Sequence, residues 1–78
     1  MNSKIKPSAL AKIRGKGPHD RVRLILHFSH ASLSHEERSF LDTMGVTDWY
    51  LSGFWGAATV DVDRLEAVAE VGAISEIA

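Results

Sequence analysis

The sequence predicts a two-layer α+β domain, in which a four-stranded antiparallel sheet is covered on one face by two helices, with a short helix ahead of them. Three observations predict it: one segment alternates apolar and polar residues as a half-buried strand does, two segments carry helix-capping signatures, and glycines separate the elements. At 78 residues, the chain has room for one small core. Its 45% hydrophobic and 24% charged residues are typical of a folded domain rather than a disordered one.

The first 20 residues are interpreted as a basic lead-in, and residues 21–78 as the domain proper. Within the lead-in, Pro7 to Ile13 is predicted to form a short helix, because proline is favoured in the first turn and aliphatic residues follow at helical spacing. The Gly15 to Pro18 segment should end that helix.

The clearest strand is Arg21 to Phe28. Side chains alternate between the two faces of a strand, and here the two sets differ strongly in polarity. The set predicted to face the core is Val22, Leu24, Leu26 and Phe28, and the set on the other face is Arg21, Arg23, Ile25 and His27. This alternation predicts a sheet with one buried face and one face open to solvent or to a partner.

A capping box follows, in which the Ser34 hydroxyl and the Glu37 carboxylate satisfy free backbone amides reciprocally. The helix is expected to run to about Met44, where Gly45 is placed to end it. The residues expected to be buried on this helix are Phe40, Leu41 and Met44.

Two further strands are predicted at Trp49 to Leu51 and Ala57 to Val62, joined by a glycine-containing turn or bulge at residues 52–56. Trp49 and Tyr50 must point to opposite faces, so one of them is expected in the core and the other on the open face.

A second cap signature at Asp63 to Glu66 predicts a second helix. Its apolar stripe is expected to be Leu65, Val68 and Ala69, and Gly72 should stop it before a last strand at Ala73 to Ile77. The resulting order of strand, helix, strand, strand, helix, strand is the split βαβ, ferredoxin-like βαββαβ arrangement. That architecture serves many unrelated functions.

Several kinds of chemistry are not expected from this chain. It has no cysteine, which excludes disulfides, a thiolate nucleophile and sulfur-ligated zinc. Its four histidines lack ligand spacing, so we predict neither a metal site nor a cofactor. No nucleophile elbow accompanies its serines, and we therefore do not predict an enzyme. The histidines are His19, His27, His30 and His35.

Positive charge is concentrated near the start of the chain, where seven of the nine lysines and arginines lie within the first 23 residues. No aromatic residue interleaves with them, so nucleic acid is not an expected partner. An RNA-recognition sheet remains the last-ranked alternative, because its central strands need stacking aromatics and the first strand offers only Phe28. With no apolar run that spans a bilayer and no signal peptide, we expect no membrane association and a cytoplasmic location.

Two parts of the chain resemble the subtilisin propeptides. The opening KIKPSALAKI, followed by a Gly-Pro turn and RVRLILHF, is similar to their first helix and strand, and the closing ATVDVDRLEAVAEVGAISEIA is similar to their last strand, helix and strand. The similarity covers Ile5 to Ile77 as a pattern of aliphatic positions. It implies a domain that inhibits a subtilisin-like serine protease, or chaperones its folding, by packing its open sheet face on protease helices while a C-terminal tail lies in the cleft.

The resemblance also implies which residues would contact the protease. Phe54 and Trp55, in the glycine-flanked turn, are predicted interface anchors. Asp61 and Glu76 are predicted to lie near sheet ends, where an acid is favoured beside a helix N-terminus of the partner. The available tail is Ser75, Glu76, Ile77 and Ala78, and its use as a strand competes with its use as a substrate mimic. The alternative is a non-inhibitory ferredoxin-like interaction or regulatory domain, whose sheet would mediate weak homo-oligomerisation or the docking of an unrelated partner.

Overall fold

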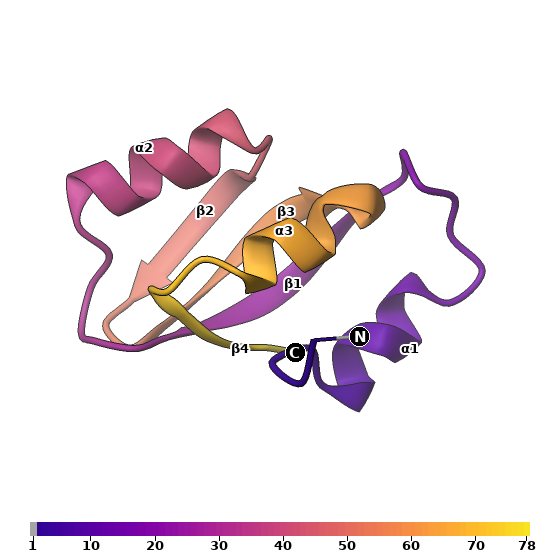
Figure 1. Ribbon diagram of the computed structural model, residues 1–78, viewed down its shortest axis with the longest axis horizontal. Helices are drawn as coiled ribbons and strands as arrows, with labels where there is room; N and C mark the ends of the chain where they lie inside the picture. Colours follow the sequence, from indigo (N-terminus) through magenta and orange to yellow (C-terminus); the bar gives the residue numbers. More distant parts are fainter. Residues whose placement is uncertain (1) are drawn as a thin grey trace.

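The computed structural model describes residues 2–78 and has the α+β architecture expected from the sequence, with a four-stranded antiparallel sheet in the order β2-β3-β1-β4. Figure 1 shows α2 and α3 on the same side of this sheet. No helix within residues 2–78 has the length and apolar character needed to cross a membrane. The elements are α1 (Pro7–Ile13), β1 (Arg21–Phe28), α2 (His35–Thr43), β2 (Thr47–Ser52), β3 (Trp55–Asp61), the 3-10 turn η1 (Val62–Arg64), α3 (Leu65–Ala69) and β4 (Ile74–Ile77).

Strand β1 has the predicted bounds and the predicted two faces. Its even-numbered side chains are buried, and Leu24 and Leu26 are among the largest fully buried side chains of the domain. Its odd-numbered side chains are exposed or half-buried. Because β1 pairs antiparallel with β3 on one side and β4 on the other, this strand sets which face of the sheet holds the core.

Helix α2 begins with the predicted capping box. The Ser34 hydroxyl accepts a hydrogen bond from the Glu37 amide at 3.1 Å, and the Glu37 carboxylate accepts one from the Ser34 amide at 2.8 Å. The prediction that Phe40 is buried is wrong, since Phe40 is 56% exposed, whereas Met44 is half-buried against the core. Only Leu41 of this helix is buried against the sheet, while Phe40 and Met44 turn toward α3, which is too short to cover them.

The β2–β3 hairpin starts earlier than predicted. Strand β2 begins at Thr47, and Asp48 adopts a φ of 57° within an irregular step of the β2–β3 register, which interrupts the alternation visible in the sequence. The hairpin closes through Gly53 and Phe54, and the φ of 64° at Gly53 suits the first position of a type II′ turn. Tyr50 is 54% exposed, whereas Trp49 packs half-buried against the core, as the opposite-face prediction requires.

Helix α3 buries the predicted stripe but lacks the predicted cap. Leu65, Val68 and Ala69 are buried. The side chain of Asp63 caps neither η1 nor α3, because the 3-10 turn starts at Val62 and places Asp63 inside the helical segment instead of ahead of it. The Asp63 carboxylate lies 3.7 Å from the His19 ring.

Strand β4 lies between β1 and the extended segment Lys4–Lys6, which we call the strap. The strap runs parallel to β4: the Lys6 amide donates to the Ile77 carbonyl at 2.9 Å and the Ile77 amide donates to the Lys4 carbonyl at 2.8 Å. On the other side, Ala78 exchanges two hydrogen bonds with Ile25, at 2.8 and 2.9 Å. The last residues of the chain are therefore held on both sides, close to its beginning (Figure 1).

Candidate docking face

The face of the sheet opposite α2 and α3 carries a continuous apolar strip. Residues that pair across antiparallel strands share a face, and the register places Ile25 opposite Ala57, and Ala57 opposite Tyr50. In the neighbouring row, His27 lies opposite Trp55. We define the apolar strip as Ile25, Tyr50, Trp55 and Ala57, on the three strands β1, β2 and β3.

The apolar strip is accessible to solvent. Ile25 is 37% exposed, Trp55 39% and Tyr50 54%, and no element within residues 2–78 covers them. The rings of Tyr50 and Trp55 are tilted by 49° with their centroids 5.6 Å apart, so the two aromatics form one packed unit. Aromatic side chains that are held in place and partly exposed are the kind of group that contributes most to protein interfaces.

Ionic groups bound the apolar strip at both ends of β1. At one end, the Arg21 guanidinium donates to the Asp61 carboxylate at 2.7 Å, to the Gly45 carbonyl at 3.1 Å and to the Thr47 hydroxyl, which ties β1, β2 and β3 together. At the other end, the Glu76 carboxylate lies 3.8 Å from the amino group of Lys6 and 3.8 Å from the His27 ring.

Arg23 is the cation of this face without a carboxylate beside it in the described part of the chain. Its guanidinium donates to the Asp48 carbonyl at 2.6 Å, which is a neutral acceptor. The charge of Arg23 is therefore not compensated locally, and Arg23 lies two residues before Ile25 on the same face of β1. A partner that offers a carboxylate at this position would gain a charge-assisted contact.

The hairpin tip is anchored to the loop between β1 and α2. The Phe54 carbonyl accepts a hydrogen bond from the Phe28 amide at 2.7 Å, and the Gly53 carbonyl accepts one from the Ser32 amide at 3.0 Å. The Phe54 side chain is 61% exposed. The tip is thus a fixed projection rather than a loose loop.

An ion pair between His30 and Glu37 joins the same loop to α2. The two ring nitrogens of His30 lie 2.9 Å from the Ser32 carbonyl and 3.0 Å from the Glu37 carboxylate, so the doubly protonated ring can donate to both. The hydrogen bond and charge of Glu37 raise the pKa of His30 above its usual 6.5. The Ser34 amide, followed by His30, lowers the pKa of Glu37 below its usual 4.5.

The structure brings some of the sequence-predicted site residues together and separates others. Trp55 and Glu76 flank His27 at one end of the sheet, whereas Asp61 lies at the opposite end, bound to Arg21. Phe54 lies at the hairpin tip.

Within the predicted tail, Ser75 is exposed and Ala78 half-buried, while the Ile77 side chain is fully buried among the core residues. Sequence reasoning left Ile25 and Tyr50 out of the predicted site. The alternation of β1 placed Ile25 on the open face, and only the strand register could join Tyr50 to it.

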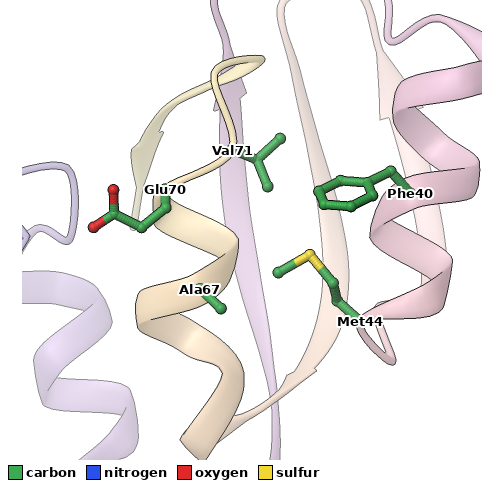
Figure 2. Close-up of a pocket in the computed structure, with 5 residues that line it drawn as sticks. All are labelled: Phe40, Met44, Ala67, Glu70 and Val71. Carbon is green, nitrogen blue, oxygen red and sulfur yellow. The ribbon is translucent and has the colours of Figure 1, made fainter.

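A separate apolar groove lies on the other layer, between α2 and α3. Its cavity of about 360 Å³ is lined by Phe40, Met44, Ala67 and Val71, with Glu70 at its border. Figure 2 shows Phe40 and Met44 facing Val71 and Ala67 across the gap, while the Glu70 carboxylate points away from it. The lining offers no acid, base or nucleophile directed into the groove, so it has no evident chemistry.

No group of three or more histidine, cysteine, aspartate and glutamate side chains within residues 2–78 is arranged to hold a metal ion. Comparison of the chain with protein-family models, with curated proteins and with solved structures finds no match.

Proposed function

We propose that this domain is a protein-binding module that docks on a subtilisin-like serine protease through the apolar strip, as an inhibitor or as a folding chaperone. The observation that carries the proposal is the uncovered strip of Ile25, Tyr50, Trp55 and Ala57 on a sheet whose opposite face is packed. The choice of a protease as partner comes from the resemblance of the sequence to subtilisin propeptides, which use the same face of a similar sheet.

The chemistry of the face supports binding to folded protein rather than to nucleic acid. Two aromatics and an isoleucine provide an apolar centre, and the pairs Arg21–Asp61 and His27–Glu76 provide polar ends. This layout of an apolar centre with a polar rim is typical of protein interfaces. An RNA-binding sheet would need more positive charge on this face to bind the phosphate backbone.

In this proposal the tail does not have to leave the sheet. Glu76 to Ala78 are held by β1 on one side, and Ile77 by the strap on the other, so insertion of these residues in a protease cleft would require β4 to detach. Docking through the apolar strip alone avoids the free-energy cost of detaching β4. Inhibition by docking needs no catalytic chemistry from this chain.

The experiment is a titration of the domain against purified subtilisin that hydrolyses a chromogenic peptide. Inhibition at micromolar concentration or below is expected. Ile25→Arg should raise the inhibition constant by about tenfold or more, because it places a charge in the centre of the contact. Ala67→Arg is the matched control, since it adds the same side chain to exposed α3 on the opposite layer.

Circular dichroism must first show that both variants are folded. Rapid digestion of the wild-type domain without a lag, or equal inhibition by the Ile25→Arg and wild-type proteins, would contradict the proposal. Salt-dependent RNA binding in a gel shift would also contradict it and would revive the RNA-recognition alternative.

The second candidate is a non-inhibitory domain that docks another protein through the same face. The observation that favours it is strand β4, because the buried Ile77 side chain and the hydrogen bonds of Ile77 with the strap hold this residue in the sheet and away from a protease cleft. Under this alternative, the domain leaves subtilisin activity unchanged, and Ile25→Arg weakens binding to the other partner.

A further inference from the structure

The two edges of the sheet differ in whether their backbone groups are covered. The strap lies along the outer edge of β4, whereas β2 is the last strand on the other side, with no strand beyond it in residues 2–78. Natural proteins usually protect a free edge with lysine, proline or a bulge. Strand β2 has neither lysine nor proline, and its irregular step at Asp48 leaves the stretch Tyr50–Ser52 regular.

Exposed apolar side chains gather at this free edge. Of the six large apolar side chains that are exposed in residues 2–78, two lie on β2, one at the hairpin tip and one at the start of the neighbouring strand β3. Leu51 is 42% exposed and adds apolar surface on the helix side of β2, while Tyr50 adds it on the open face. Such a concentration at one edge is typical of a contact surface. The four are Tyr50, Leu51, Phe54 and Trp55.

Helix α2 presents opposite charges beside the same edge. The Arg38 guanidinium lies 5.5 Å from the Trp49 ring centre, and the Asp42 carboxylate accepts a hydrogen bond from the Trp49 indole at 3.1 Å. Arg38 and Asp42 are therefore both on the β2 side of α2, one turn apart. Within residues 2–78, neither forms an ion pair.

We propose that two copies of this chain associate through their β2 edges, with the strands antiparallel and with Arg38 of each copy facing Asp42 of the other. A two-fold axis near the level of Trp49 makes the two α2 helices antiparallel neighbours, so that residues at equal distances from the axis oppose each other. In this arrangement, each Arg38 lies opposite an Asp42. Parallel α2 helices would instead place Arg38 opposite Arg38 and Asp42 opposite Asp42. This second copy extends the sheet beside β2.

The contact spans one strand and one helix from each copy, which is small for a specific interface. We therefore expect a dissociation constant of roughly 10 to 100 µM. The strap blocks the other edge, so association should stop at the dimer. The proposal does not depend on a protease partner, and protease inhibition and dimerisation are measured separately.

The test is sedimentation velocity of the full chain over a range of concentrations. The wild type should shift from monomer to dimer, and Arg38→Glu and Asp42→Lys should each weaken dimerisation by about tenfold or more, since each opposes like charges. An equimolar mixture of these two variants should recover the dimer, because Arg38 then meets Asp42, and Lys meets Glu, across the interface. Arg64→Glu, a charge reversal on η1 away from β2, should leave dimerisation unchanged.

Hydrogen exchange gives a second readout that does not need a variant. The backbone amides of β2 that have no partner within the monomer should become protected as the protein concentration rises. A protein that stays monomeric at millimolar concentration, a mixture of the two variants that associates no better than either alone, or unchanged exchange in β2 would each overturn the proposal.

Discussion

Gly56 is the position where the structure leaves least space for a side chain. A Cβ atom added there would lie 2.5 Å from the Tyr50 carbonyl oxygen, 3.2 Å from a methyl carbon of Leu51 and 3.3 Å from the ring of Phe28. The first distance is about 1 Å shorter than an ordinary contact of roughly 3.5 Å. Because the closest atom belongs to the backbone, relief requires β2 and β3 to move apart. We expect Gly56→Ala to lower the free energy of unfolding by about 2 to 3 kcal/mol.

The assay is thermal and urea unfolding followed by circular dichroism, with two other glycines as controls. In a domain of this size, a loss of about 2 to 3 kcal/mol lowers the Tm by roughly 10 to 20 °C. Gly72→Ala has no atom within 4 Å of the new Cβ and no positive φ, so its stability should stay within about 1 kcal/mol of wild type. Gly53→Ala has space but a φ of 64°, and should cost about 1 to 2 kcal/mol. If Gly56→Ala proved as stable as Gly72→Ala, the packing of β2 on β3 described here would be refuted.

Three further predictions concern α2 and its N-terminus. Leu41→Ala should lower the free energy of unfolding by about 2 to 5 kcal/mol in urea titrations, because Leu41 is the buried side chain of this helix. Ser34→Ala should cost about 0.5 to 2 kcal/mol in the same assay, since it removes the capping hydroxyl. The His30–Glu37 pair should stabilise the fold most between pH 4.5 and 6.5: its contribution is lost as pH rises through the raised pKa of His30 and as pH falls through the lowered pKa of Glu37. Glu37→Gln keeps a capping side chain and should flatten this dependence in urea midpoints measured against pH.

Local signals in the sequence were sufficient for several elements. The bounds of α1 and β1 match the predictions, because a proline at a helix start and an alternating strand are defined by neighbouring residues. The capping box of Ser34 and Glu37 is likewise a local motif and was confirmed. For the candidate docking face, the alternation of β1 was sufficient to place Ile25 on the open side.

Features that depend on distant partners were not predictable in the same way. The exposure of Phe40 follows from the shortness of α3, and the bulge at Asp48 is visible only once β2 is paired with β3. The strap depends on Ile5 meeting Ile77 across nearly the whole chain. The apolar strip is assembled by register, so the adjacency of Tyr50 and Trp55 required the structure.

The parallel pairing of the strap with β4 also decides how the domain should respond to mechanical load. Traction on the chain before Lys4 and after Ala78 would pull the two strands past each other along their length, so the hydrogen bonds between Lys4, Lys6 and Ile77 would share the force instead of opening one after another. The domain should therefore unfold abruptly when it is stretched by its ends, although only a few residues at each end hold the strap and β4 together.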